Sequence, residues 1–326
     1  MPRVLSGVQP SGEAHIGNYL GAFRQWAATQ HEREAFHCIV DLHALTLEIS
    51  PDELRQRTVD TAITLLAVGL DPEVATVFVQ SHVPEHPRLA WLLECTATMG
   101  ELRRMTQFKE KGGGQESVRA GLFTYPVLQA ADILLYQADL VPVGDDQRQH
   151  IELTRDLAIR FNHHYGEVFT VPAPEVPKVA ARVMDLQHPE RKMSKSIDSP
   201  LGTVGVLDDP TEIERKVKRA VTDTDTGVAY DPVRRPGVAN LLDLLAAAQG
   251  GDPVELAGRY TRYGDLKADL VEALVELLRP VRVRAAELHA ERGAVERVLA
   301  AGAGKAHAVA AVTYRRAAEA IGLLSA

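Results

Sequence analysis

The chain has 326 residues, of which 45% are apolar and 25% charged, a balance typical of a globular protein with a sizeable core. At roughly 150 residues per domain, this length favours two domains or one large domain with an extension. Lys and Arg total 36 against 44 Asp and Glu, so the formal charge of −8 argues against a protein that coats DNA by bulk electrostatics. This net charge is still compatible with a local basic patch that binds RNA.

Cysteine usage and hydropathy indicate a cytoplasmic protein. Cys38 and Cys95 lie outside any CxxC or Cys/His array, so we expect neither a disulfide framework nor a structural zinc site. No long apolar core follows Arg3, as a secretory signal would require. No stretch approaches the roughly 18 apolar residues of a membrane span, so no membrane partner is expected.

The first part of the chain alternates strand-like and helix-like segments. In chain order we expect a strand at 4–5, a helix from about 15 past 26, a strand at 36–40, a helix at 51–70, a strand at 76–79 and a helix at 87–99. Ser50 supplies a cap and Pro51 a first-turn proline for the second helix. Such alternation predicts an α/β fold with a doubly wound parallel sheet.

One loop-like segment interrupts this alternation of strands and helices. The run 109–117 contains three consecutive glycines and should form a mobile loop, either a linker or a loop that closes on a ligand. Beyond it we expect a helix at 120–138, a strand at 140–143 and a helix at 147–161. Pro172, Pro174 and Pro177 then introduce an irregular region that extends to Ser196.

From Thr211 onward the strand signals disappear. Apolar residues recur there at helical spacing, at Leu266, Leu270, Leu274, Leu277 and Val281. We therefore predict an α/β domain over residues 1–196 and an all-helical domain over 197–326, with a kink at Pro280.

Several common catalytic motifs are missing from the sequence. It contains no GxGxxG after a strand and no HExxH, and Gly304-Lys305 lacks the upstream glycine and the hydroxyl residue of a P-loop. The adjacent pair His163-His164 lacks the spacing that would place both rings on one metal ion. We therefore expect no protein-held metal.

The segment His15-Ile16-Gly17-Asn18 lies at an expected helix start, just after the first strand. Unpaired backbone N–H groups and the positive end of the helix dipole can hold a phosphate there. Gly17 would let a nucleotide approach the backbone, while His15 and Asn18 can donate hydrogen bonds to it. Taken alone, a solvated helix cap would explain this segment nearly as well.

The segment 192–196, Lys-Met-Ser-Lys-Ser, places two ammonium groups beside two hydroxyls. These groups suit a triphosphate whose charge must be held as pyrophosphate leaves. Taken alone, a basic surface loop is the simpler interpretation.

The two segments together resemble the signatures of class I aminoacyl-tRNA synthetases, and further segments resemble bacterial tryptophanyl-tRNA synthetases over essentially the whole chain. Those further segments are Gly7–Gly12, Met105–Lys109, Ala130–Tyr136, Val141–Gln147 and Ala220–Asp223. The resemblance implies a Rossmann-like nucleotide-binding domain, followed by a helical domain that recognises the tRNA anticodon. It also implies that the last helix packs back on the first domain.

The resemblance implies an ATP site between the two signatures, with Mg²⁺ entering as the ATP complex. Its residues would be Gln9, Pro10, Ser11, His15, Gly17, Asn18, Gly144, Asp145, Asp146, Val183, Lys192, Met193, Ser194, Lys195 and Ser196. Three lysines would stabilise the phosphates in the transition state, namely Lys192, Lys195 and Lys111.

Asp132 matches the residue that accepts the indole N–H of tryptophan in this family. The other expected pocket residues are Leu5, Gly7, His43, Tyr125, Gln129, Val141, Val143 and Gln147. Leu5 and Gln129 depart from the Phe and Met that are usual in the family. Leu5 would remove an aromatic wall of the pocket, and Gln129 would introduce an amide that needs hydrogen-bond partners. We expect both departures to change the shape of the pocket and its affinity for tryptophan more than the type of reaction.

The implied reaction has two steps: tryptophan attacks ATP to give tryptophanyl-adenylate and pyrophosphate, and the tRNA ribose hydroxyl then takes the tryptophan. The expected partners are L-tryptophan, tRNA(Trp) and a second copy of the chain, and no DNA. A candidate basic face for tRNA consists of Arg215, Lys216, Lys218 and Arg219, although a solvated helix face is the simpler interpretation.

Three alternatives remain. A tyrosyl-tRNA synthetase would share the fold, and Gln129 could then serve a phenolic hydroxyl, although Asp132 favours tryptophan. A non-catalytic paralogue could bind tryptophan, ATP or RNA as a sensor, but such proteins tend to lose signature residues that are intact here. A different nucleotidyl transferase would not explain the helical half.

Overall fold

The structure is a computed structural model and describes residues 1–112, 118–144, 147–175, 183–194 and 200–324, apart from the side chains of 110–112. Within these residues one five-stranded sheet has the order β3-β2-β1-β4-β5, and every neighbouring pair is parallel. The strands are β1 Arg3–Val8, β2 Glu34–Ile39, β3 Thr76–Val79, β4 Leu140–Pro142 and β5 Ala173–Glu175. The parallel sheet confirms the predicted α/β class.

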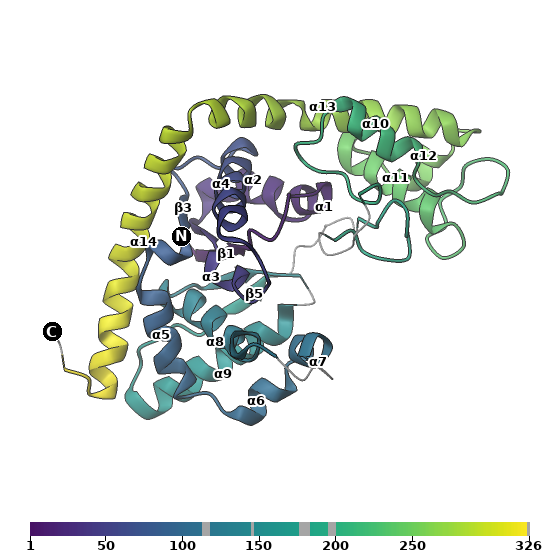
Figure 1. The fold of residues 1–326 in the computed structure, drawn as a ribbon. Helices are drawn as coiled ribbons and strands as arrows, with labels where there is room; N and C mark the ends of the chain where they lie inside the picture. The colour runs from purple at the N-terminus through teal and green to yellow at the C-terminus, as the bar shows by residue number, and fades with distance from the viewer. Residues whose placement is uncertain (113–117, 145–146, 176–182, 195–199, 325–326) are drawn as a thin grey trace.

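Helices surround the sheet and make up the second half of the described chain (Figure 1). Those of the first half are α1 Ile16–Asn18, α2 Arg24–Thr29, α3 Asp41–Ala44, α4 Pro51–Ala67, α5 Glu85–Glu94, α6 Met99–Arg104, α7 Thr106–Gly112, α8 Ala120–Leu135 and α9 Arg148–Tyr165. Those of the second half are α10 Pro210–Lys218, α11 Pro236–Gln249, α12 Pro253–Ala257, α13 Tyr263–Ala290 and α14 Arg292–Ile321. A π-helical turn over Tyr19–Phe23 joins α1 to α2.

Local signals account for most of these boundaries. The Ser50 hydroxyl accepts a hydrogen bond from the Glu53 backbone N–H at the start of α4. Thr98 and Glu101 form a capping box that starts α6, so the single helix expected at 87–99 is divided into α5 and α6. The predicted loop at 109–117 is wrong in its first part, because α7 continues to Gly112, and residues 113–117 lie outside the described ones.

The edge strand β5 lies in the region expected to be irregular. Its residue Pro174 pairs in register with Val141, and Pro is tolerated there because an edge strand leaves one side without ladder hydrogen bonds. In the second half, α13 runs unbroken through Pro280. Its buried face includes Leu278, whereas the expected Leu277 is only partly buried.

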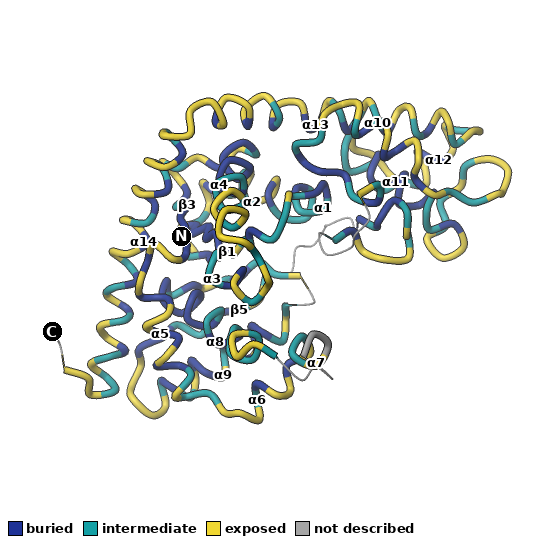
Figure 2. Tube along the Cα trace, in the orientation of Figure 1, coloured by how far each residue is buried: buried dark blue, intermediate teal, exposed yellow. Residues whose placement is uncertain are grey.

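The core has two parts, one on each side of the sheet. One cluster joins Ile39, Val77 and Val79 to helices α10–α13, and the other joins Leu5 and Phe36 to α5, α8 and α9. Figure 2 shows the outer turns of α13 and α14 exposed. Buried residues make up half of β1 and most of β2, β3 and the second half of α8.

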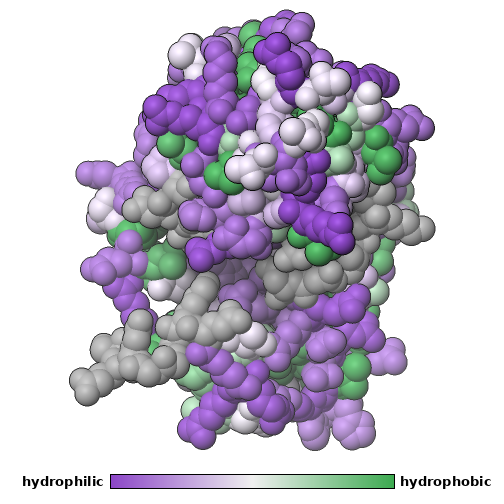
Figure 3. Space-filling model, turned by 90° about the vertical axis from the view of Figure 1, so that its right-hand side faces the viewer, coloured by the Kyte–Doolittle hydropathy of each residue, from purple (hydrophilic) through white to green (hydrophobic). Residues whose placement is uncertain are grey.

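The last two long helices form an angle around the sheet (Figure 1). Helix α14 returns to pack on β3 and α5. A Cβ at Gly302 would collide with the carbonyl oxygen of Val77, so this glycine permits the close approach of α14 to the sheet. The side of the molecule seen in Figure 3 is mostly hydrophilic, with hydrophobic residues scattered over it. Among the described residues, no helix is both long enough and apolar enough to cross a bilayer.

Candidate active site

The strand order places a crevice at the carboxyl ends of the central strands. Strand β1 lies between β2 and β4 in the sheet. The chain passes from β1 to β2 on one side of it and later forms β4 on the other side, and ligands bind at such a switch point in parallel α/β sheets. Gln9 follows β1, His43 follows β2 through α3, Gln80 follows β3 and Val143 follows β4. These residues therefore meet at one edge of the sheet.

The buried carboxylate of Asp132, on α8, is the centre of this region and is only 2% exposed. Its Oδ2 lies 2.8 Å from His43 Nε2, and its Oδ1 lies 2.7 Å from Gln80 Nε2 and 2.6 Å from His86 Nδ1. The other ring nitrogen of His86 lies 2.9 Å from the Tyr136 hydroxyl. Side chains from α3, from α5 and from the end of β3 thus fix one carboxylate.

These hydrogen bonds keep Asp132 ionised. Burial alone would raise its pKa, but the hydrogen bonds from His43 and His86 outweigh burial and lower the pKa to about 2. A carboxylate only accepts hydrogen bonds and has about four lone-pair positions, of which three are used. Among the described contacts one lone-pair position, on Oδ2, is therefore left for a further donor such as an indole N–H.

Gln80, His86 and Tyr136 are site residues that the sequence did not reveal. Gln80 is fully buried, and its Oε1 accepts a hydrogen bond of 3.1 Å from the Leu42 backbone N–H. A usable signal existed, because Gln80 directly follows β3, as Gln9 follows β1. His86 lacks such a signal, since only the packing of α5 on α8 brings it to Asp132.

Tyr125, Gln129 and Asp132 share one face of α8, at helical spacing. The Tyr125 hydroxyl lies 2.8 Å from Gln107 Oε1 and 2.8 Å from His150 Nε2. Burial raises the pKa of Tyr125 to about 12, so its hydroxyl stays protonated at neutral pH. Gln129 is partly buried.

The remaining expected pocket residues lie on β1, on and just after β4, and at the start of α9. Leu5 and Val141 are buried in the hydrophobic cluster that includes α8. Gly7 is exposed near the carboxyl end of β1, and a Cβ there would lie 3.3 Å from Val40 Cγ1. Val143 is partly buried after β4, and Gln147 is the N-cap residue of α9.

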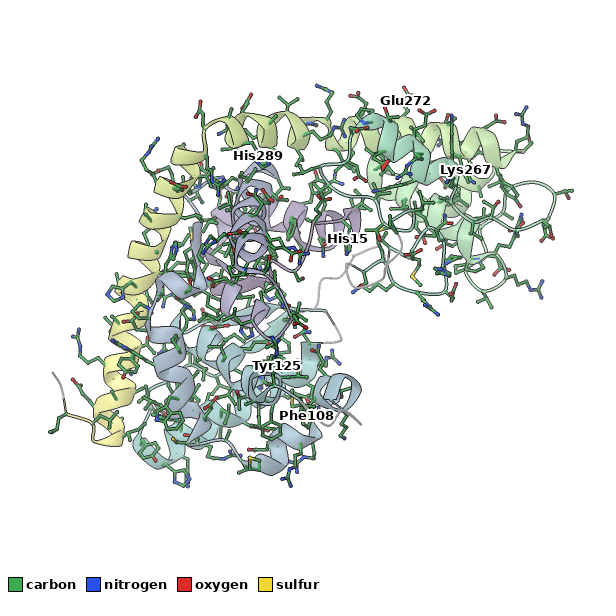
Figure 4. All side chains as sticks on the ribbon, in the orientation of Figure 1. His15, Phe108, Tyr125, Lys267, Glu272 and His289 are labelled. Carbon is green, nitrogen blue, oxygen red and sulfur yellow. The ribbon has the colours of Figure 1, made fainter. Side chains whose placement is uncertain are left out.

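The first signature element forms a compact helix start. His15 is the N-cap residue of α1, and its backbone N–H donates to Asn18 Oδ1 at 3.1 Å. A Cβ added to Gly17 would lie 2.9 Å from His15 Nδ1 and 3.5 Å from Val183 Cβ. Gly17 therefore leaves the space between the His15 ring and Val183 that a larger residue would fill. In Figure 4, His15 lies toward the helices of the second half and Tyr125 lies on the opposite side of the sheet edge.

The second signature element begins in a hairpin of residues 183–193. The Met193 N–H donates to the Val183 carbonyl at 3.0 Å, and the Asp185 N–H donates to the Arg191 carbonyl at 2.9 Å. This pairing brings Lys192 and Met193 to the strand that carries Val183, which adjoins Gly17. The two elements, far apart in sequence, therefore lie next to each other, with Lys192 exposed and Met193 buried.

A third segment ties the first element to the second half of the chain. The Ile16 N–H donates to the Val204 carbonyl at 2.8 Å, and the Val206 N–H donates to the Ala14 carbonyl at 2.8 Å. His15 and Gly205 face each other in this antiparallel pairing. The segment leads directly into α10.

Several expected site residues lie outside what the structure describes: Asp145, Asp146, Lys195, Ser196 and the side chain of Lys111. Gln9, Pro10, Ser11, Gly144 and Ser194 are described; Gln9 Nε2 donates to the His43 carbonyl at 3.3 Å, and Gly144 is exposed. Within the described ranges, the structure contains no group of three or more His, Cys, Asp or Glu residues that could hold a metal ion.

The proposed basic face on α10 is largely charge-compensated. Lys216 pairs with Asp208 at 2.6 Å, Arg215 pairs with Glu212, and Lys218 pairs with Glu214. Lys216 is also buried. These ion pairs favour the alternative of a solvated helix face.

Comparisons with known proteins agree with this geometry. The family model for class I tRNA synthetases (W and Y) matches residues 1–279. Tryptophan–tRNA ligase 1 of Streptomyces coelicolor is 56% identical over 99% of this chain and 98% of its own.

Two solved structures are also similar over almost their whole length. Tryptophanyl-tRNA synthetase of Mycoplasma pneumoniae has a TM-score of 0.91 at 38% identity, covering 100% of this chain and 99% of that one. The Campylobacter jejuni enzyme, complexed with ADP and tryptophan, has a TM-score of 0.87 at 34% identity, covering 98% and 100%. The resemblance seen in the sequence is confirmed, and the chain belongs to the class I tRNA synthetases of tryptophan and tyrosine.

Proposed function

We propose that this chain is a tryptophan–tRNA ligase that activates L-tryptophan with ATP and transfers it to the 3′ end of tRNA(Trp). The observation that carries this proposal is the buried, ionised Asp132, which is fixed by three donors and has room for one more. The names of the full-length relatives support the same amino acid.

In the first step, the tryptophan carboxylate attacks the α-phosphorus of ATP and the bond to the leaving pyrophosphate breaks. Lys192 and Ser194, together with Lys195 and Lys111, stabilise the negative charge of the phosphates. In the second step, the terminal ribose hydroxyl of the tRNA attacks the activated carbonyl and releases AMP. No side chain has to act as a covalent nucleophile.

The nucleotide lies between the two signature elements. Gly17 leaves the space that the nucleotide enters, and Val183 contributes the neighbouring wall against adenine. Asn18 Oδ1 is already used by the His15 N–H, so its Nδ2 is the group that donates to the nucleotide. Gln9 and Ser11 complete this side at the end of β1.

Mg²⁺ enters with ATP rather than at a site built by the described side chains. Mg²⁺ keeps several waters and is commonly held through substrate phosphates. When bound, it neutralises phosphate charge.

Residues 1–196 form the Rossmann-like catalytic domain in this proposal, and residues 197–326 form the helical domain that recognises the anticodon. The protein functions in the cytoplasm.

A homodimer completes the proposal. Leu45 and Trp91 are 53% and 65% exposed, and they line a cavity of about 410 Å³ beside His43 and Tyr125. Such an apolar rim is suited to a protein partner, and a second copy would cover it. Trp91→Glu should shift the protein to monomers in analytical ultracentrifugation, and an unchanged sedimentation coefficient would count against this face.

Aminoacylation of purified transcripts tests the proposed function. The protein with ATP, Mg²⁺ and labelled tryptophan should charge tRNA(Trp) and leave tRNA(Tyr) uncharged. Charging of tRNA(Tyr) with tyrosine would favour the tyrosine enzyme. Tryptophan binding without any adenylate formation would favour the sensor.

A further inference from the structure

Asn240, on α11, is a polar residue of the helical half that is only 2% exposed. Its side chain extends to the hairpin of residues 183–193, which carries the second signature element. The Met184 N–H donates to Asn240 Oδ1 at 2.9 Å, and Asn240 Nδ2 donates to the Met184 carbonyl at 2.9 Å. One amide therefore binds both main-chain polar groups of one residue.

The hairpin pattern explains why Met184 needs this partner. Met184 faces Lys192 in an antiparallel bridge, and the neighbouring residues make its hydrogen bonds, from Met193 to Val183 and from Asp185 to Arg191. Alternate residues of such a ladder point their N–H and C=O away from the partner strand. The outward groups of Met184 point to α11, where Asn240 takes the place of a third strand.

The two ends of the hairpin are held differently. At the end toward the turn, the Leu186 N–H donates to the Gly202 carbonyl at 2.9 Å and the Val221 N–H donates to the Leu186 carbonyl at 2.8 Å. Near Val183, two hydrogen bonds with Asn240 tie the hairpin to α11. Val183 and Met193 are also buried in the hydrophobic cluster that includes α11, so Asn240 adds a directional bond to non-directional packing.

We propose that Asn240 is a positioning residue for ATP: it fixes the hairpin so that Val183 stays beside Gly17 and Lys192 stays directed to the phosphates. This inference rests on the proposed function. Asn240 binds the main chain of Met184 and acts through it. Through Asn240, helix α11 of the helical half is hydrogen-bonded directly to the hairpin on the proposed ATP side.

Two variants of the full chain test this role. Asn240→Leu keeps a similar volume and loses both hydrogen bonds. Asn240→Asp keeps the acceptor for the Met184 N–H but turns a second oxygen toward the Met184 carbonyl. Since a displacement of about 1 Å can cost on the order of 100-fold in rate, each variant should lower kcat/KM for ATP by about 10- to 100-fold in pyrophosphate exchange.

Tryptophan binding separates positioning from a general structural role. The dissociation constant for tryptophan, measured by calorimetry without ATP, should stay within about twofold in both variants, because Asp132 and its partners do not contact the hairpin. Gln187→Ala is the matched control. It removes an exposed bond of 2.8 Å from the turn of the same hairpin to the Arg219 carbonyl, and it should leave both constants unchanged.

The outcomes distinguish this inference from the proposed function. An active wild-type protein whose kcat/KM for ATP is unchanged in the Asn240 variants would overturn the positioning role. Equal losses in ATP use and tryptophan binding would also overturn it. Wild-type protein that exchanges no pyrophosphate with any amino acid would instead refute the proposed function. If Asn240→Leu does not fold, Asn240→Asp decides alone.

Discussion

The proposed tryptophan side and the proposed ATP side of the site are held by different kinds of interaction. On the tryptophan side, buried side chains from α3, α5 and the end of β3 converge on Asp132. On the ATP side, main-chain hydrogen bonds join distant segments, such as Ile16 to Val204 and Met193 to Val183. Substitutions on the first side should therefore change amino-acid recognition, and those on the second side should change the use of ATP.

The largest expected effect is on the ATP side. Lys195→Ala removes a positive charge that we propose acts on the departing pyrophosphate, so adenylate formation should fall by about 100- to 1,000-fold. Tryptophan binding should change little, because the charge is needed only as the phosphates rearrange. Stopped-flow adenylate formation and calorimetric tryptophan binding measure the two quantities, and equal losses in both would contradict the assignment.

Asp132→Ala should have the next largest effect, on the tryptophan side. The variant leaves His43, Gln80 and His86 without their shared acceptor and removes the acceptor proposed for the indole N–H. The three orphaned groups mainly lower stability, whereas the lost acceptor for the indole N–H, at about 1–3 kcal/mol, should lower kcat/KM for tryptophan by about 10- to 100-fold.

Exposed Asp156, on α9, supplies the control for that variant as Asp156→Ala. The control should behave as the wild type, and the KM for ATP should be unchanged in both proteins. A KM for ATP that rises as much as the KM for tryptophan would mean that the two sides are not independent.

Gly17→Ala should have a smaller effect that is confined to ATP. The new methyl group would lie 2.9 Å from His15 Nδ1 and would narrow the space beside Val183. We expect the KM for ATP to rise by about tenfold while tryptophan binding is unchanged. Gly304→Ala, where no atom lies within 4 Å, is the matched control and should have no effect on kinetics. A Gly17→Ala enzyme with normal KM for ATP would place the nucleotide elsewhere.

Substitution of His37, on β2, should change neither tryptophan recognition nor the use of ATP. It is 2% exposed, its ring lies 5.0 Å from the Trp26 ring, and among the described residues neither of its ring nitrogens has a hydrogen-bond partner. Burial lowers its pKa to about 4, whereas an unfolded chain has the ordinary value near 6.5. Between these values the unfolded state binds more protons, so the free energy of unfolding falls as pH falls from 6.5 toward 4.

His37→Phe should remove this pH dependence. In urea unfolding, the free energy of unfolding of the wild type should fall by about 1 kcal/mol more than that of the variant when the pH is lowered from 7.5 to 5.5. The kinetic constants for ATP and tryptophan at pH 7.5 should be similar in both proteins. Parallel stability curves for the two proteins would show that His37 is not the group responsible.

Sequence patterns predicted the fold well where each element has its own local signal. Apolar runs identified β2 and β3, and Ser50-Pro51 identified the start of α4. Strand β5 was missed because Pro172 and Pro174 are typical of loops, and only its pairing with β4 makes it a strand. The hairpin of residues 183–193 was missed for a similar reason, since its pairing and Asn240 depend on contacts distant in sequence.

The site shows the same limit. The resemblance placed Asp132, His43 and Tyr125 in one pocket, and the structure brings Asp132 and His43 into contact, with the Tyr125 ring 6.1 Å from that of His43. It did not identify Gln80 or His86, which reach Asp132 only when β3 and α5 pack beside α8. For Arg215, Lys216 and Lys218 on α10, the structure adds acidic partners in the preceding turn and on the same helix, and the role of this basic run in tRNA binding stays a prediction.

Amino-acid-dependent exchange of labelled pyrophosphate into ATP tests the central claim most directly. The purified protein with Mg²⁺ would be assayed with each amino acid in turn. We predict exchange with tryptophan alone, because ionised Asp132 has room for the indole N–H. Exchange with tyrosine would contradict this account of Asp132 and Gln129, and no exchange with any amino acid from folded protein would contradict the proposal that the chain is an enzyme.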